Sequence, residues 1–454
     1  MDQSTSVWNE AEQRYRDRTP TSREYHLAAQ RVLPGGDTRG SIFYRPYPIH
    51  VERGAGCRLW DVDGNEYVDF QGNKTSLIHG HAHPHVLQAI RDQLERGTVH
   101  ASPTAAITKL ASMLVSRIPS LDRVRFTNSG TEAMMHAIRA ARGATGRIKI
   151  MKMEGGYHGS YDAVEVSVRL TAKGSATSAA QLESRGLSPR IADEAVVAPY
   201  NNLEATRNLI RRHAGELAAV IVEPMMGRGS IPAEPDFLHG IREETRLHDV
   251  VLIFDEIQTF RLAYGGAQSL FGVQPDLTTL GKLIGGGMPA GAFGGRSEIM
   301  DQYDPERPDA MQHAGTFNGS SVTMVAGIAT LELLTEPEYR RINELGAQLR
   351  AGLQDVLDLA GITATVTGVG SFAYVHFVPR PVRDQRSAAR SPKELPSLMN
   401  LALLNRGLFS CSGNRLIVST CMTTDDVRAA VDTVRDAVAE IASALPRASA
   451  GARA

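Results

Sequence analysis

The sequence predicts an α/β fold in which a mostly parallel sheet carries helices on both faces. Short apolar runs alternate with stretches of helical periodicity between about residues 124 and 254, and this repeated β-then-α order is typical of parallel sheets. The run Val250–Phe254 is apolar throughout, as expected of a strand buried on both faces. Asp255 and Glu256 follow it directly, and the carboxyl ends of strands are where open α/β sheets bind ligands.

The N-terminal part of the chain predicts helices followed by a hairpin. Apolar residues recur among Glu, Arg and Gln in residues 1–33, as in one or two amphipathic helices, and the Pro34-Gly35-Gly36 break ends that pattern. The turn Asp63-Gly64-Asn65 separates two strand-like runs, which is a hairpin signal. Short strands are expected at Ile49–Val51, Cys57–Trp60 and Tyr67–Phe70, and helical periodicity begins at Pro84.

Strands and helices then alternate up to a long amphipathic helix that begins at Tyr339. We predict an N-terminal segment (1–75) that joins a small domain, a large domain (76–330), a C-terminal small domain (331–445) and a disordered tail (446–454). Two polar stretches, 171–190 and 380–396, are expected to be mobile surface loops. Strands are expected at 124–126, 148–153, 195–198, 219–222 and 250–254, and helices at 131–142, 203–213 and 237–248.

Composition predicts a soluble globular protein. Hydrophobic residues make up 42% and charged residues 22% of the 454 residues, which is enough apolar content for a large core. The formal net charge of -1 gives no electrostatic basis for binding nucleic acid or a membrane. Met1–Arg18 lacks the apolar core of a secretory signal, and no apolar run approaches a membrane span. Three scattered cysteines favour a reducing compartment, and we expect the cytoplasm.

One lysine stands in an apolar, glycine-dense stretch, Thr278–Gly287. Lysine is strongly hydrated and rarely buried, and a desolvated lysine has a lowered pKa that makes its amine nucleophilic. We therefore predict catalytic roles for Lys282 and for Asp255. A lysine that binds an aldehyde, together with an aspartate that keeps a pyridinium nitrogen protonated, is the pairing that pyridoxal phosphate requires.

The two segments Asp255–Thr259 and Thr279–Lys282 together resemble the class III pyridoxal-phosphate-dependent aminotransferases. The stretch Phe260–Arg296 looks like the branch that contains glutamate-1-semialdehyde aminomutases and β-amino-acid aminotransferases, and the resemblance covers about Pro34–Thr424. It implies a fold-type I transferase with a large, mostly parallel-sheet domain and a small α+β domain. It also implies pyridoxal 5'-phosphate as the cofactor. The alternative is a glycine-rich turn with an incidental surface lysine.

A strand-to-helix junction, Phe126–Ala133, is a candidate phosphate site. A helix N-terminus offers free N–H groups and a positive dipole end, and hydroxyl groups add donors. An ordinary helix N-cap would account for these residues equally well. The resemblance implies that Ser129, Gly130 and Thr131 bind the cofactor phosphate.

The cofactor ring needs partners on its faces. The turn Glu154–Gly159 follows a predicted strand, and the resemblance implies that Tyr157 stacks on the ring, with His158 close by. Ile257 points to the same side of an extended chain as Asp255 and is expected to pack on the other ring face. The alternative for Tyr157 is a core tyrosine in a glycine turn.

Thr316 lies in the glycine-flanked segment His313–Gly319. The resemblance, and nothing in the local spacing, implies that this threonine binds the phosphate of the cofactor held by a partner subunit. The working unit is then a homodimer. The alternative is a threonine in a surface turn.

Arg39 is the candidate substrate-binding residue. It follows the Pro-Gly-Gly break, and a guanidinium binds a carboxylate through two parallel hydrogen bonds. The resemblance places a carboxylate-binding arginine here. Arg45 and Arg261 are weaker candidates, and an exposed, salt-bridged arginine is the alternative.

A run of alternating histidines suggests a metal site that we do not expect. The side chains lack a carboxylate or cysteine at ligand spacing, and similar segments in the family are structural. The four residues are His79, His81, His83 and His85.

The reaction predicted from the sequence is intermolecular transamination of a β- or other non-α-amino acid. Aminomutases of this branch usually carry a glutamate shortly after the late Gly-Leu turn, whereas Gly407–Arg415 contains none. The segments Gly315–Gly319 and Arg39–Tyr44 also look closer to β-amino-acid aminotransferases. Loss of a group that grips the intermediate favours release of a keto product. The expected partners are a small amino donor and a keto-acid acceptor, and the alternative is a glutamate-1-semialdehyde 2,1-aminomutase. Further alternatives are a pyridoxal-phosphate racemase or decarboxylase and a non-catalytic regulator or scaffold with this fold.

Overall fold

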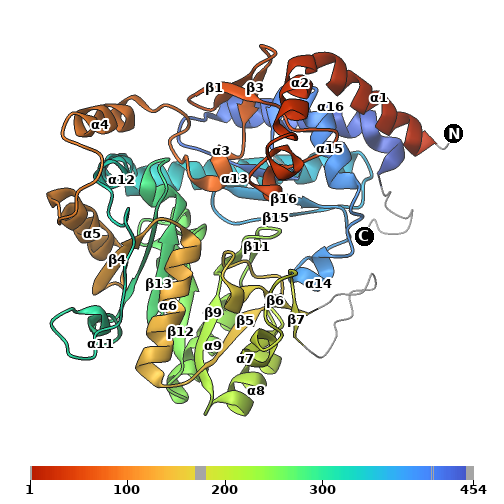
Figure 1. Cartoon of the computed structure of the whole chain (residues 1–454). Helices are drawn as coiled ribbons and strands as arrows, with labels where there is room; N and C mark the ends of the chain where they lie inside the picture. The colour runs from red at the N-terminus through yellow and green to blue at the C-terminus, as the bar shows by residue number, and fades with distance from the viewer. Residues whose placement is uncertain (1–2, 169–179, 411, 413, 446–454) are drawn as a thin grey trace.

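The computed structural model describes residues 3–168, 180–410, 412 and 414–445 (Figure 1). Within these residues the central sheet has seven strands: β4 (Arg123–Thr127), β5 (Lys149–Met153), β8 (Ala195–Ala198), β9 (Leu217–Val222), β12 (Val251–Asp255), β13 (Leu277–Gly281) and β14 (Gly291–Gly295). Their order is β4-β14-β13-β12-β9-β5-β8. Neighbours from β13 to β8 pair in parallel, whereas β14 is antiparallel to β13 and to β4. The predicted mostly parallel sheet is confirmed.

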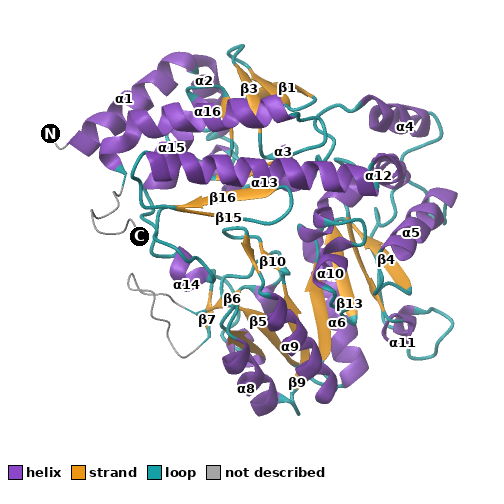
Figure 2. Cartoon of the chain, turned by 180° about the vertical axis from the view of Figure 1, so that it is seen from behind, coloured by secondary structure: helices purple, strands orange, loops and turns teal. Residues whose placement is uncertain are grey.

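Successive residues of β12 face the two helical layers that cover this sheet. Leu252 and Phe254 lie in one apolar cluster with Phe237 of α9 (Pro235–Leu247). Ile253 lies in a second cluster with Ile138 of α6 (Gly130–Thr145). Figure 1 shows α6 in front of the sheet, and Figure 2 shows α9 on the opposite side together with α8 (Leu203–His213). Both faces of β12 are therefore buried, which explains its unbroken apolar sequence.

The two ends of the chain combine in the upper part of Figure 1. The short strand β17 (Leu408–Phe409) pairs in parallel with β3 (Glu66–Asp69). A C-terminal segment therefore completes a sheet whose other strands come from the N-terminal part of the chain. That sheet also contains β1 (Val51–Ala55) and β2 (Arg58–Asp61), and β15 (Thr365–Thr367), β16 (Phe372–His376) and β18 (Arg415–Ile417) form another. The helices around them are α1 (Gln3–Arg18), α2 (Pro20–Ala29), α13 (Glu336–Leu359), α15 (Leu395–Leu404) and α16 (Thr424–Ile441).

Shorter elements connect these layers. Helices are α3 (Gly72–Thr75), α4 (Pro84–Leu94), α5 (Ala105–Arg117), α7 (Ile191–Glu194), α10 (Gly266–Phe271), α11 (Ser297–Met300), α12 (Ser321–Leu333) and α14 (Gln385–Ala388). Strand pairs are β6 (Val166–Ser167) with β7 (Gln181–Leu182) and β10 (Met225–Met226) with β11 (Ile231–Pro232). No helix in the described part of the chain has the length and apolar composition needed to cross a membrane.

Most elements expected from the sequence are present, with ends shifted by a few residues. The N-terminal helices, the hairpin of β2 and β3, and the alternating strands and helices are confirmed. The expected strand at 49–51 begins only at Val51. The stretch 380–396, expected as a loop, contains α14, and Arg383 and Arg386 pair with Glu234 and Glu154. Residues 169–179 and 446–454 lie outside the described residues, and the domain division stays a prediction.

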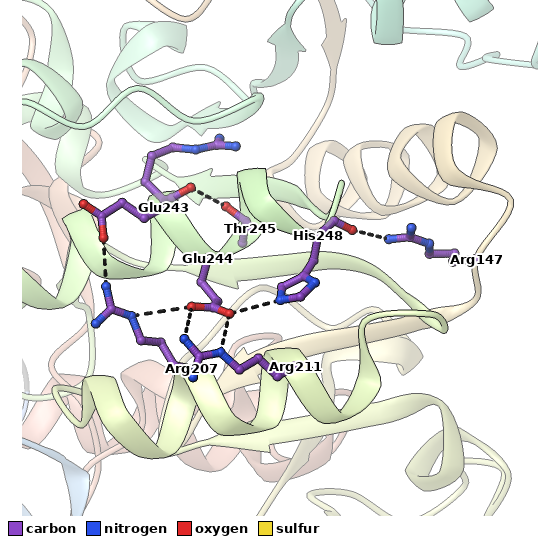
Figure 3. Close-up of polar contacts among 8 residues, drawn as sticks. Arg147, Arg207, Arg211, Glu243, Glu244, Thr245 and His248 are labelled. Carbon is purple, nitrogen blue, oxygen red and sulfur yellow. Dashed lines mark hydrogen bonds and ion pairs between the residues drawn. The ribbon is translucent and has the colours of Figure 1, made fainter.

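A buried carboxylate joins the outer helices α8 and α9 (Figure 3). The side chain of Glu244 is 4% exposed and accepts hydrogen bonds from Arg211 at 2.7 and 3.0 Å. His248 contacts the same carboxylate at 3.1 Å, and the Nε atom of Arg207 lies 3.6 Å from it. The hydrogen bonds from Arg211 are the main cause that lowers the pKa of Glu244. The ionised carboxylate of Glu244 therefore holds α8 and α9 together.

We predict that Glu244→Gln lowers the free energy of unfolding by about 1–2 kcal/mol, because it removes charged hydrogen bonds from a buried acceptor. The pKa of Glu244 is lower in the folded than in the unfolded chain, so its stabilisation is present above its ordinary pKa of 4.5 and is lost as the pH falls through the folded value. Denaturant titrations at pH 7 and pH 3 measure both effects. Glu243→Gln is the control, since that side chain is 73% exposed. Equal losses in the two variants at pH 7 would contradict the prediction.

Candidate active site

Lys282 lies where β13 ends and the short helix η5 (Lys282–Gly285) begins. Its backbone adopts a φ of 52°, a left-handed conformation that is strained for a residue with a side chain. Desolvation by the surrounding protein lowers the pKa of Lys282 to about 8, and the nearby charge of Asp255 opposes that shift. The predicted combination of a desolvated lysine and a neighbouring carboxylate is therefore present in the fold.

Asp255 is the last residue of β12 and pairs in register with Thr279 of β13. One carboxylate oxygen lies 2.8 Å from Nδ1 of His158, and the other accepts a hydrogen bond from the backbone N–H of Ile257 at 3.1 Å. Asp255 and His158 are both buried, and parallel pairing brings the ends of β12 and β13 together. The structure thus places Asp255, His158 and Lys282 at one edge of the sheet.

Ile257 connects this edge to the candidate phosphate loop. A side chain at Gly130 would place its Cβ 2.6 Å from Ile257, and one at Gly281 would lie 3.4 Å from it, so Ile257 packs between two glycines. Ser129 is the N-cap of α6, and its hydroxyl accepts a hydrogen bond from the N–H of Glu132 at 3.2 Å. The hydroxyl of Thr131 accepts a hydrogen bond from the N–H of Ser160 at 3.2 Å. The N-terminus of α6 therefore lies beside the Asp255 edge.

The ring of Tyr157 is 47% exposed, so it is not a core tyrosine. Its backbone N–H donates to the buried carboxylate of Glu223 at 3.1 Å, and Glu223 also accepts a hydrogen bond from the N–H of Gly227 at 2.9 Å. Burial raises the pKa of Glu223. The guanidinium of Arg228 lies 5.7 Å from the ring centroid of Tyr157, within the range of a cation–π contact. Through these two backbone hydrogen bonds, Glu223 holds the Tyr157 turn in place.

The structure separates the three arginines considered for the substrate. Arg39 is exposed, and its guanidinium donates to the side-chain oxygen of Asn73 at 2.9 Å. Arg45 is also exposed. Arg261 is 2% exposed and donates to the hydroxyl of Ser371 at 3.1 Å, so it supports the core. Thr316 does not lie at the Lys282 edge; it is exposed in the loop before α12.

The alternating histidines form separate contacts. His79 lies 2.7 Å from the hydroxyl of Thr420, and His81 lies 2.7 Å from the carboxylate of Asp69. His85 approaches Glu332 at 3.4 Å. Among the residues that the structure describes, no group of three His, Cys, Asp or Glu side chains is placed to hold a metal ion.

A cavity of about 410 Å³ carries several positive charges that the sequence did not indicate. The charges of Arg415 and Lys74 both act on Lys282, and each contributes to lowering its pKa. Arg415 also contacts the side chain of Gln258 at 3.4 Å, three residues beyond Asp255. These residues come from distant parts of the chain, so no local spacing could have identified them. The cationic residues that line the cavity are Lys74, Arg228, Lys393 and Arg415.

Comparison with known proteins assigns the family. The model of the family "Aminotransferase class-III" matches residues 42–438. The chain belongs to the class III aminotransferases. A glutamate-1-semialdehyde 2,1-aminomutase from Methanothrix thermoacetophila is 42% identical over 391 residues, which cover 86% of this chain and 89% of that relative.

Solved structures of this family have the same fold. An omega-transaminase from Sphaerobacter thermophilus matches with a TM-score of 0.89 and 44% identity, covering 93% of this chain and 98% of that one. A glutamate-1-semialdehyde aminomutase from Pseudomonas aeruginosa matches with a TM-score of 0.88 and 29% identity, covering 96% and 98%. The chain is therefore a pyridoxal-phosphate-dependent enzyme with the expected fold, and the family resemblance is confirmed.

Pyridoxal phosphate is the cofactor of this class III enzyme, and the residues present suit it. A transaminase with the cofactor bound matches at a TM-score of 0.86 and 36% identity, covering 93% of this chain and 98% of that one. Nε2 of His158 and the hydroxyl of Thr279 are buried and have no hydrogen-bond partner in the described part of the chain. A polar group buried in this way is costly unless something pairs with it. Such atoms beside Asp255 and Lys282 suit a bound polar ring.

The prediction of intermolecular transamination is wrong. Seven relatives at 36–42% identity, which span most of this chain, are all glutamate-1-semialdehyde 2,1-aminomutases. The prediction relied on a missing glutamate in Gly407–Arg415 and on the resemblance of Gly315–Gly319 and Arg39–Tyr44 to β-amino-acid aminotransferases. The structure shows that Arg415, Lys74 and Asn414 line the cavity there, so the missing carboxylate does not leave that wall apolar. Three short segments were given more weight than similarity along the whole chain.

Proposed function

We propose that this protein is a glutamate-1-semialdehyde 2,1-aminomutase, which moves an amino group between adjacent carbons of one substrate molecule. The similarity to seven aminomutases carries the proposal. The cationic cavity supports it, because two of its lining residues, Lys74 and Arg415, are near enough to Lys282 to lower its pKa and because the substrate bears a carboxylate. Substrate and product are isomers, so the reaction needs no external oxidant or amino acceptor.

Pyridoxal phosphate supplies an aldehyde that binds amines covalently and a ring that accepts electrons from the bonds of the attached carbon. In the proposal, Lys282 binds that aldehyde and afterwards moves the proton between carbons through Nζ. A pKa of about 8 suits this work, since general acid–base catalysis is most effective when the pKa lies near the working pH. Asp255 stabilises positive charge on the ring nitrogen. His158, whose Nδ1 lies 2.8 Å from Asp255, orients the Asp255 carboxylate.

The remaining assignments are also proposals. Ser129, Gly130 and Thr131 bind the phosphate, and the support is their position at the N-terminus of the 16-residue helix α6. Tyr157 and Ile257 contact opposite faces of the ring. Their support is the half-exposed ring of Tyr157 and the position of Ile257 between Gly130 and Gly281.

We propose further that the enzyme works as a homodimer. Thr316 would reach the phosphate bound by the partner subunit, and the support is its exposed position next to Phe317, whose side chain is 58% exposed. The large domain would hold the cofactor and the terminal segments would form the small domain. This division is supported by the pairing of β17 with β3. The cytoplasm remains the proposed compartment on the basis of three scattered cysteines.

A turnover assay tests the proposed function. The purified holoenzyme is supplied with glutamate-1-semialdehyde alone, and 5-aminolevulinate is measured over many turnovers. We expect sustained formation of product without any keto acid. Product that stops after one turnover and resumes only when 2-oxoglutarate or pyruvate is added would contradict the proposal.

A further inference from the structure

The turn α3 is left-handed, although it contains three residues with side chains. The φ angles of Gly72, Asn73, Lys74 and Thr75 are 53°, 47°, 57° and 80°. Glycine adopts this region freely and asparagine tolerates it, but lysine and threonine are strained there. Successive left-handed residues persist only where the surroundings enforce them, and such strain is concentrated at functional sites. The backbone of Lys282 shares this conformation.

Buried polar groups hold this turn from the β3 side. One carboxylate oxygen of Asp69 accepts hydrogen bonds from the N–H groups of Gln71 at 2.8 Å and Gly72 at 3.1 Å. The other carboxylate oxygen lies 2.7 Å from Nε2 of His81. The side-chain oxygen of Gln71 accepts a hydrogen bond from the N–H of Lys74 at 3.3 Å. Asp69 and Gln71 are 4% and 5% exposed, so water competes little for these hydrogen bonds, which stabilise the strained backbone.

The two central side chains of the turn contact the segment that contains Arg39. Asn73 accepts a hydrogen bond from the guanidinium of Arg39 at 2.9 Å. Lys74 donates from its ammonium to the backbone oxygen of Ser41 at 2.9 Å. The short helix η2 (Gly40–Ile42) is thus attached to the same left-handed turn through its middle residue and through the residue that precedes it. A right-handed turn would direct these two side chains elsewhere.

The same turn lies against the lysine edge of the sheet. Residues of α3 contact η5, which begins at Lys282, and a side chain at Gly287 would come within 2.9 Å of Leu77. The charge of Lys74 contributes to the lowered pKa of Lys282, and Lys74 lines the cationic cavity. Figure 1 shows α3 beneath the sheet that contains β1 and β3. The turn therefore connects Arg39 to the Lys282 site.

We propose that the left-handed turn Gly72–Thr75 is a specificity device, in which Asn73 positions Arg39 for the substrate carboxylate and Lys74 adds a second positive charge facing it. This inference rests on the proposed function, in which the substrate of the Lys282 site carries a carboxylate. Asn73 is a positioning residue, since it acts through Arg39. The strained backbone of the turn directs the side chains of Asn73 and Lys74 to the same segment, Arg39–Ser41.

Two amines of equal chain length test the proposal without requiring turnover. The holoenzyme is titrated with 4-aminobutyrate and with n-butylamine, and the absorbance change of the cofactor gives two dissociation constants. We expect Asn73→Gly and Lys74→Asn each to weaken 4-aminobutyrate binding by about 10-fold, because each removes a hydrogen bond that involves a charged group. Butylamine binding should change less than about 2-fold, because that amine has no carboxylate. Both replacements suit left-handed backbone, so the turn is retained.

Matched variants separate positioning from general damage. Lys74→Arg keeps the charge and should retain the preference for 4-aminobutyrate, whereas Arg39→Ala should abolish it. Asp249→Gly changes another left-handed residue, with a φ of 51°, and should leave both constants unchanged. An unchanged preference in Asn73→Gly and Lys74→Asn, or equal weakening of both amines, overturns the inference. Wild-type enzyme without any preference also overturns it.

The proposed function and this inference can fail separately. If glutamate-1-semialdehyde is not converted but the amine preference falls as expected, the function is wrong and the turn keeps its role. If 5-aminolevulinate forms normally and the preference is unaffected by the variants, the function stands and the turn is only structural.

Discussion

Lys282→Ala should abolish turnover, with a fall in kcat of at least about 10⁴-fold, because in the proposed mechanism one side chain supplies both the covalent attachment and the proton transfer. Borohydride reduction of the wild-type holoenzyme should fix the cofactor to Lys282. The variant should still bind pyridoxal phosphate non-covalently, since the residues proposed for the phosphate and ring are unchanged. Peptide mapping by mass spectrometry identifies the labelled lysine.

Lys152 provides the internal comparison for that experiment. It is fully buried in β5 and donates to the backbone oxygen of Val164 at 2.6 Å, and burial lowers its pKa as it does for Lys282. It therefore shares desolvation with Lys282 but is engaged in the core. A label on Lys152, or a Lys282→Ala variant that retains more than about 1% of the wild-type kcat, would overturn the assignment.

The pH dependence of cofactor attachment follows from the same pKa. Only the neutral amine attacks the aldehyde, so the attachment rate of the apoenzyme should fall as the pH drops below about 8. At pH 8 about half of the Lys282 side chains would be neutral, compared with roughly 0.3% at the ordinary pKa of 10.5. A rate that rises tenfold per pH unit up to pH 10 would show that the lysine is not desolvated.

The sequence was sufficient where function and fold depend on one continuous segment. The apolar run that became β12 ends in Asp255, and the glycine-dense stretch carries Lys282, so the buried strand and the two candidate residues beside it could both be predicted. Local patterns of this kind can be recognised in the sequence without knowing how the rest of the chain folds.

Other features depend on residues that are far apart in the sequence. Arg228 reaches Tyr157, and Arg415 lies near Lys282, only because the chain folds back, and no spacing in the sequence reveals such contacts. The left-handed turn was missed because Asn73 and Lys74 lack the glycine that usually marks positive φ. The reaction was predicted wrongly for a related reason. One absent glutamate was interpreted without the cationic side chains that the fold brings to the same cavity.

Asp255→Asn should leave the fold and the bound cofactor intact and slow the chemical step by about 10²–10⁴-fold. The range is that expected when a buried, preorganised charge is removed. Asparagine keeps the shape of the side chain and can still accept the hydrogen bond that the Ile257 N–H now donates at 3.1 Å. It lacks the negative charge that would hold a proton on the ring nitrogen. Rapid-mixing absorbance measurements with glutamate-1-semialdehyde separate the slowed step from substrate binding.

The neighbouring carboxylate supplies the control for this prediction. Glu256 is fully buried, and it accepts hydrogen bonds from the N–H of Ala267 at 2.6 Å and from Gln268 at 3.0 Å, so it fastens α10 to the sheet. Glu256→Gln should therefore lower the melting temperature while the rate per bound cofactor stays within about 3-fold of wild type. Asp255→Asn should do the opposite, with a large loss of rate and a small change in melting temperature. Near-normal turnover in a folded, cofactor-loaded Asp255→Asn protein would remove Asp255 from the chemistry, because the charge would then have no part in the rate.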